Sequence, residues 1–195
     1  PLPRHPEGQA SGRGQVVDAA ITDGVIHMMA SVVGRSLRGA FIEERQRNML
    51  DGGAPYYGVY ETADGEHVSI GPIEPQFFRE FCERVGVPQQ LYGAQNDTAR
   101  WPELRAALQR IFRGGTRDGW TRLLEGTDAC FAPVLRLSEA AKHPHNVSRE
   151  AFVEIDGVTQ PAPAPRFSRT PAIVQGPPPH AVANVPDVLA RWGGQ

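Results

Sequence analysis

The sequence predicts a mixed α+β fold with a β-hairpin, several helices and further short strands. Two β-rich runs, at residues 56–60 and 67–70, flank the pair Asp64 and Gly65. An Asp-Gly pair between two such runs is a strong signal for a hairpin. Helices are indicated where apolar residues recur at helical spacing behind Pro75 and Pro102. Proline is favoured in the first turn of a helix, because its missing N–H would have been unpaired there.

The first part of the chain is expected to contribute little to the hairpin domain. Residues 1–13 are rich in Pro, Gly and polar residues and predict a disordered lead-in. Residues 14–55 predict a short strand at 15–19, a helix with an apolar stripe from Ile21 to Val33, and a connector dense in Arg and Glu. Asp51, Gly52 and Gly53 then predict a turn in which positive φ is tolerated.

The remaining elements predict one small domain and a tail. Residues 56–158 hold the hairpin, the two proline-led helices, a shorter helix near residues 120–124, and strands near 131–137 and 152–155. Residues 159–195 are proline-rich and predict an extended return segment that ends in a short helix.

Composition restricts the classes of function. The chain has 195 residues and a net charge of −2, so it offers no large basic field to nucleic acid or to a membrane surface. No apolar stretch is long enough to span a membrane. Its two cysteines, Cys82 and Cys130, stand in apolar surroundings and predict two buried free thiols, which fits a reducing cytoplasm.

Glu74 is the first candidate for chemistry. It stands between the end of a predicted strand and the start of a helix, a common place for side chains that face a ligand. The proline that follows biases its backbone to extended conformations, and the positive end of the helix favours an ionised carboxylate. From spacing alone, stabilisation of the helix terminus is the favoured role for this glutamate.

The run NMLDGGAPYY at residues 48–57 is the second candidate. Two adjacent glycines let backbone approach a ligand closely, and tyrosine offers apolar area with a hydrogen-bonding tip. A tight turn that feeds an aromatic core strand would need the same residues. No metal site is predicted, because His143 and His145 have no evident third ligand.

Four motifs together resemble the α-methylacyl-CoA racemase branch of the family III CoA-transferase superfamily. They are GQVVDA at 14–19, NMLDGGAPYY at 48–57, IEPQF at 73–77 and TDAC at 127–130. The resemblance runs from about residue 14 to residue 171 and implies the small domain of that fold. It also implies that residues 14–50 and the tail after 160 normally pack on an N-terminal Rossmann-like domain outside this chain. The stripe from Ile21 to Val33 is therefore expected to be exposed, or covered by a second copy.

The resemblance assigns roles that spacing alone left open. It implies a catalytic role for Glu74, which in the family is thought to pair with a histidine of the partner subunit. It implies an acyl-CoA substrate, an interlocked homodimer, a role in lipid metabolism and no separate cofactor, since CoA is part of the substrate. The implied substrate-binding residues are Asn48, Leu50, Asp51, Gly52, Gly53, Tyr57 and Ile73.

The implied reaction is epimerisation of a 2-methylacyl-CoA thioester by 1,1-proton transfer through an enolate. The family's catalytic histidine and aspartate precede the position of Gly14, so we expect this chain to be inactive alone. Two alternatives stay open. One is part of a CoA-transferase that works through an acyl-aspartyl intermediate. The other is a non-catalytic fragment that assembles with a full-length relative.

Overall fold

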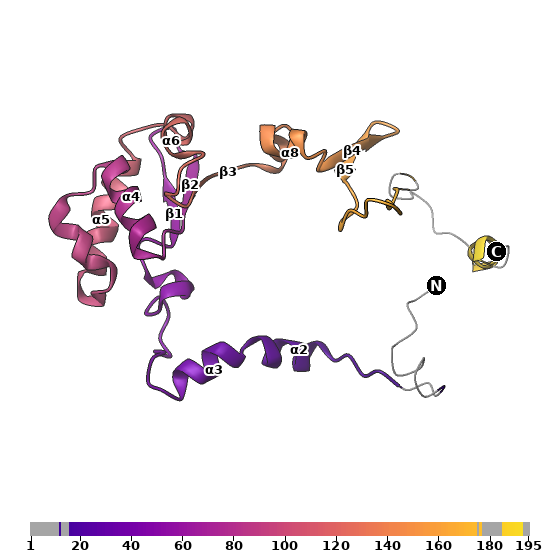
Figure 1. Cartoon of the computed structure of the whole chain (residues 1–195), viewed down its shortest axis with the longest axis horizontal. Helices are drawn as coiled ribbons and strands as arrows, with labels where there is room; N and C mark the ends of the chain where they lie inside the picture. Colours follow the sequence, from indigo (N-terminus) through magenta and orange to yellow (C-terminus); the bar gives the residue numbers. More distant parts are fainter. Residues whose placement is uncertain (1–11, 13–15, 175, 177–184, 193–195) are drawn as a thin grey trace. The chain divides into compact units, whose positions relative to one another are not determined.

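The computed structural model describes residues 12, 16–174, 176 and 185–192 (Figure 1). Its contacts divide the chain into two compact units, residues 1–132 and residues 133–195, which are described separately below. Both units mix helices with antiparallel strands, so the predicted α+β class is confirmed. The finer boundaries at residues 13, 55 and 158 stay predictions.

The first unit begins with two short helices. They are α2 (Ile21–Met28) and α3 (Ala30–Ser36), separated by a turn at Met29. The strand predicted at 15–19 is wrong over the described residues 16–19, which have no regular structure. A strand needs a neighbour to satisfy its N–H and C=O groups, and Val16 is 95% exposed.

The apolar stripe on α2 and α3 is exposed, as predicted. Neither helix has a buried residue, although both carry large apolar side chains. The exposed ones are Ile21, Val25, Ile26, Met28, Met29 and Val33. An apolar face of this kind is typical of a contact surface.

A three-stranded sheet with the order β1-β2-β3 forms the centre of the first unit. Strands β1 (Gly58–Glu61) and β2 (His67–Ile70) pair antiparallel, with Tyr60 opposite Val68. Gly65 adopts φ +73° in the turn, which confirms the hairpin predicted from Asp64 and Gly65. Strand β3 (Phe131–Val134) completes the sheet, and the Gly71 N–H donates to the Cys130 carbonyl at 2.9 Å.

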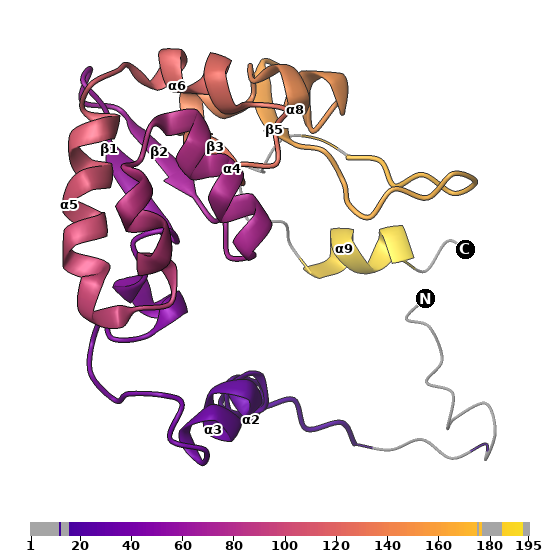
Figure 2. The ribbon, with the colours of Figure 1, turned by 60° about the vertical axis from the view of Figure 1, so that its left-hand side comes forward.

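Helices α4 and α5 lie beside β1 and β2 in both views (Figures 1 and 2). The helical elements of this part are α4 (Pro75–Val85), η2 (Gln89–Gln95), η3 (Thr98–Arg100), α5 (Trp101–Phe112) and α6 (Arg117–Leu124). Their apolar faces meet the inner face of the sheet in one core. Its largest buried side chains include Tyr60, Val68, Phe78, Phe81, Leu104, Leu108, Phe112 and Leu124. The helices predicted behind Pro75 and Pro102 are confirmed.

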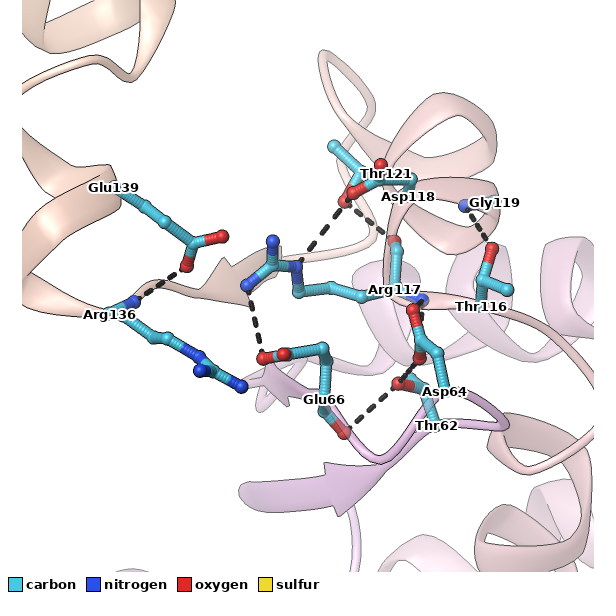
Figure 3. Close-up of polar contacts among 10 residues, drawn as sticks. All are labelled: Thr62, Asp64, Glu66, Thr116, Arg117, Asp118, Gly119, Thr121, Arg136 and Glu139. Carbon is cyan, nitrogen blue, oxygen red and sulfur yellow. Dashed lines mark hydrogen bonds and ion pairs between the residues drawn. The ribbon is translucent and has the colours of Figure 1, made fainter.

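Arg117 ties α6 to the turn of the hairpin (Figure 3). Its backbone N–H donates to the Asp64 carboxylate at 3.2 Å, and its guanidinium lies 3.4 Å from Glu66. The Thr62 hydroxyl also donates to Asp64. The Arg117 and Glu66 side chains are only 12% and 25% exposed, so this ion pair is partly shielded from water.

The second unit holds short helices and a separate hairpin. Helices α7 (Leu137–Ala140) and α8 (Pro144–Ser148) precede strands β4 (Phe152–Ile155) and β5 (Val158–Pro161), which pair antiparallel; α9 (Val185–Trp192) comes last. Asp156 and Gly157 both adopt positive φ in the turn between β4 and β5. At the start of α7 the Arg136 N–H donates to Glu139 at 2.8 Å (Figure 3). Within the described ranges, no helix is both long and apolar enough for a membrane span.

Candidate functional site

The turn before the hairpin is built around one carboxylate. It forms the short helical turn η1 (Met49–Gly53), with Asn48 as its N-terminal cap. The Asp51 carboxylate accepts hydrogen bonds from the N–H groups of Asn48 and Gly53, both at 3.0 Å, and of Arg47 at 3.2 Å. Burial alone would raise the pKa of Asp51, but these hydrogen bonds, together with one from the Asn48 amide, hold it below its usual value.

Asn48 fastens the turn to the connector that precedes it. Its side chain is buried, accepts from the Ile42 N–H at 2.9 Å and donates to the Ile42 carbonyl at 2.8 Å. It also donates to Asp51 at 2.8 Å. Asn48 and Asp51 therefore shape the turn in this structure, and the substrate contacts implied for them stay predictions.

The two glycines of the turn are required for different reasons. Gly52 adopts φ +90°, a conformation that L side chains rarely adopt. Gly53 is buried, and a Cβ there would lie 2.5 Å from the Asn48 carbonyl oxygen and 2.7 Å from that of Gln46. The predicted turn with positive φ is confirmed at Gly52, and close approach of the chain's own backbone explains the glycine at position 53. The approach of this backbone to a ligand stays a prediction.

A surface hollow gathers three of the predicted substrate-binding residues. Its volume is about 570 Å³, which lies within the range of small-molecule sites. Leu50, Gly52 and Tyr57 line it, and the Leu50 and Tyr57 side chains are 58% and 41% exposed. The other lining residues are Gly58, Val59, Ser69, Ile70, Gly71, Thr127, Cys130, Phe131 and Ala132. Asn48, Asp51, Gly53, Ile73 and Glu74 do not line this hollow.

Glu74 stands at the junction between β2 and α4, as predicted. Its backbone is extended, with φ −71° and ψ 138°, and Pro75 opens the helix. Its side chain is exposed and makes no hydrogen bond to the helix terminus. The buried Gln95 amide fixes the backbone just before it, donating to the Ile73 carbonyl at 2.8 Å.

Cys130 is the residue of this region that sequence reasoning misjudged. Cys82 is buried as predicted, but Cys130 is exposed and lines the hollow. Cys130 adopts a φ of +49° and forms a bend between α6 and β3. At this bend the burial expected from its apolar neighbours does not extend to the Cys130 side chain. Partial desolvation raises the pKa of the Cys130 thiol, and the negative charge of Glu74 raises it further.

Alkylation of Cys130 will therefore depend on Glu74. Removing that negative charge by Glu74→Gln lowers the thiol pKa, so more thiolate is present at any pH below it and alkylation becomes faster. Burial raises the pKa of Cys82 to about 12, so that thiol stays unreactive. Iodoacetamide labelling followed by mass spectrometry measures the alkylation rate of each of the two cysteines as a function of pH. If the pH dependence of Cys130 alkylation is unchanged in Glu74→Gln, the charge of Glu74 does not reach the Cys130 thiol.

A second hollow of about 610 Å³ borders the same turn. Arg47, Gly53, Trp101 and Arg105 contribute to its lining. The Arg105 guanidinium donates to the carbonyl oxygens of Gly52 and Gly53, both at 2.8 Å. Neither Arg105 nor Gln95 was a sequence candidate, because nothing in their local pattern distinguishes them from other helix-surface residues. No cluster of three or more potential metal ligands occurs among the described residues.

The model of CoA-transferase family III matches residues 6–184, so the chain belongs to that family. Solved structures agree on the fold. A CaiB/BaiF family protein from Brucella suis superposes with a TM-score of 0.67 at 18% identity, covering 94% of this chain and 50% of that one. A hypothetical protein from Mycobacterium tuberculosis gives 0.64 at 19% identity, covering 90% and 47%.

Among characterised relatives, the chain is similar to α-methylacyl-CoA racemases. It is 39% identical to the one from Mus musculus over 169 residues and 36% identical to the one from Homo sapiens over 164 residues. These matches cover 86% and 84% of this chain, but 44% and 43% of the relatives. The chain also shares 29% identity over 174 residues with succinyl-CoA–D-citramalate CoA-transferase of Chloroflexus aurantiacus, covering 84% and 43%. It thus spans less than half the length of the curated relatives that it matches.

Proposed function

We propose that this chain is the C-terminal part of an α-methylacyl-CoA racemase, which epimerises 2-methylacyl-CoA thioesters through an enolate. The observation that carries the proposal is the hollow. It brings together Leu50, Gly52 and Tyr57, three residues that family resemblance implicates in substrate binding. The identity of 39% and 36% to two such racemases supports the same reaction.

The hollow is suited to the acyl part of the substrate. Leu50, Val59 and Phe131 offer apolar area, and the exposed Tyr57 ring adds a surface with a polar tip. The negative charge of Glu74 raises the pKa of Cys130, which lines the hollow. In the proposed site Glu74 faces the reacting end of the substrate and not the helix terminus.

The chemistry needs two acid–base groups on opposite faces of the α-carbon. One removes the α-proton, hydrogen-bond donors stabilise the enolate oxygen, and the other returns a proton to the opposite face. In this chain Glu74 is proposed to act with such a group, as its family counterpart is thought to pair with a histidine of another subunit. The thioester itself acidifies the proton, so the proposed reaction uses no separate cofactor. An interlocked homodimer and a cytoplasmic location belong to the same proposal.

A first test is exchange of the α-proton of a 2-methylacyl-CoA in deuterated water, followed by NMR. The catalytic histidine and aspartate of the family precede the region matched here, so the chain alone is expected to show no exchange above buffer. Glu74→Gln serves as the matched variant. Exchange that is present in the unaltered chain and lost in Glu74→Gln would overturn the expected inactivity, and would show that this half carries its own acid–base pair.

A second test measures binding without requiring turnover. Cys130 lines the hollow and Cys82 is buried, so alkylation of Cys130 reports occupation of the hollow. A 2-methylacyl-CoA is expected to slow this alkylation in a saturable manner. If no concentration of the thioester protects Cys130, the hollow does not bind the proposed substrate.

The first alternative is part of a family III CoA-transferase with an acyl-aspartyl intermediate. The 29% identity to succinyl-CoA–D-citramalate CoA-transferase favours it. Protection of Cys130 from alkylation, compared between two thioesters, distinguishes the racemase from the transferase. Stronger protection by succinyl-CoA than by a 2-methylacyl-CoA would favour the transferase.

The second alternative is a non-catalytic chain that assembles with a full-length relative. The exposed apolar stripe of α2 and α3 favours it. Titration of the chain against a full-length racemase, followed by sedimentation, tests it directly. Absence of a complex would exclude such an assembly.

A further inference from the structure

We propose that Arg105 is a positioning residue of the acyl-CoA hollow. Its guanidinium holds the turn η1 against α5, so that Leu50 and Gly52 line the hollow. This inference rests on the proposed function for the identity of the ligand, but its structural part can be tested by itself.

The contact joins two elements that are far apart in the sequence. One terminal nitrogen of Arg105 donates to the Gly52 carbonyl and to the Gly53 carbonyl, both at 2.8 Å, across 53 and 52 residues of sequence. On α5, Arg105 follows Leu104 and precedes Leu108 by one turn, and both leucines are fully buried. The buried leucines fix α5 in the core, and the Arg105 hydrogen bonds connect the turn to this fixed helix.

The turn supplies the Asp51 acceptor for some of its own N–H groups, whereas the two glycine carbonyls accept hydrogen bonds from outside the turn. The Asp51 carboxylate accepts hydrogen bonds from the N–H groups of Asn48 and Gly53, at the start and the end of η1. The Asn48 amide links the turn to the Ile42 carbonyl. The carbonyls of Gly52 and Gly53 receive their side-chain hydrogen bonds from α5. Among the side-chain hydrogen bonds of the described residues, those of Arg105 are the ones that connect η1 to a helix of the core.

Packing supports only part of the turn, because Met49 contacts the core and Gly53 is buried. Gly52 is exposed and lines the candidate hollow, and the buried Gly53 borders the second hollow of about 610 Å³. Glycine also contributes no side chain to fill such space. Hydrogen bonds from a fixed cation therefore add a directed restraint on where the exposed part of the turn lies relative to α5.

Arg105 is not engaged in an ion pair that would explain its place. None of the salt bridges among the described residues includes it. Its planar guanidinium suits two neighbouring carbonyls, because it presents several N–H groups in a fixed geometry. A lysine at this position would keep the charge but would present its donors from a single mobile ammonium group.

The test compares Arg105→Met, Arg105→Lys and Arg110→Met. The first removes the donors and keeps much of the stem, and the second retains the charge and one donor group. The third is the control, since Arg110 is an exposed residue on the same helix. Two quantities are measured for each variant. They are hydrogen exchange of the Asn48 and Gly53 amides by NMR, and the 2-methylacyl-CoA concentration that half-protects Cys130 from alkylation.

Arg105→Met is expected to speed exchange at Asn48 and Gly53 and to raise the half-protecting concentration by roughly tenfold, which corresponds to the loss of a hydrogen bond from a charged donor. Arg105→Lys should recover part of both effects, and Arg110→Met should leave both unchanged. Equal acceleration at core amides such as that of Leu108 would mean a general loss of stability and would overturn the positioning role. Unchanged exchange and protection in Arg105→Met would overturn it too.

Failure of the proposed function gives a different result. In that case the thioester does not protect Cys130 even in the unaltered chain. The amide exchange of Asn48 and Gly53 still reports whether Arg105 orders the turn.

Discussion

Replacing Phe112 by alanine is expected to destabilise the first unit by about 3–5 kcal/mol, the usual cost of removing a large aromatic side chain from a core. Phe112 is fully buried at the C-terminal end of α5. Its ring stacks on Tyr60 at 5.2 Å between centroids and meets Trp120 edge-on at 5.3 Å. It therefore joins the sheet, α5 and α6, and alanine would leave a cavity that three elements surround.

Urea unfolding followed by tryptophan fluorescence measures this change, because Trp120 contacts the deleted ring. Leu123→Ala is the matched control on α6, since Leu123 is 44% exposed and should cost no more than about 1 kcal/mol. A loss of less than about 1 kcal/mol in Phe112→Ala would show that this core collapses around the gap.

Gly53→Ala is expected to have the second-largest effect, with a loss of about 1–3 kcal/mol, as is typical of overpacking. The added Cβ would lie 2.5 Å from the Asn48 carbonyl oxygen, and this backbone atom cannot move aside as the end of a long side chain can. The turn must therefore shift, which would also disturb the Arg105 hydrogen bond to the Gly53 carbonyl. We expect weaker protection of Cys130 by a 2-methylacyl-CoA in addition to the loss of stability.

Gly93→Ala provides the control, because a Cβ there meets nothing within 4 Å and Gly93 lines neither hollow. The two variants are compared by urea unfolding and by thioester protection of Cys130. If Gly53→Ala matches Gly93→Ala in both measurements, the close approach of the turn backbone is not a constraint on this protein.

Local sequence predicted the elements that carry the candidate site. The Asp64 and Gly65 pair predicted the hairpin, because positive φ at the glycine is a local backbone property. Pro75 predicted both the start of α4 and the extended backbone of Glu74, since proline restricts its own φ and the residue before it. These predictions needed no information about distant parts of the chain.

Other predictions failed or were missing because they depended on distant partners. The strand at 15–19 was predicted from β-rich residues, but a strand forms only beside a hydrogen-bonding neighbour. Cys130 was predicted to be buried from its apolar neighbours, although a bend at positive φ exposes its thiol. Its exposure depends on how α6, β2 and β3 meet.

Neighbouring residues were sufficient to predict the fold class, the family and the junction that carries Glu74, because turns, proline positions and contiguous motifs are local properties of the chain. The tertiary structure shows which of the predicted residues share the hollow: Leu50, Gly52 and Tyr57 line it, whereas Asn48 and Asp51 hold the turn together. It also decided the roles of Gln95 and Arg105. Each donates to backbone carbonyls more than 20 residues away in the sequence, and such contacts arise only when the chain has folded.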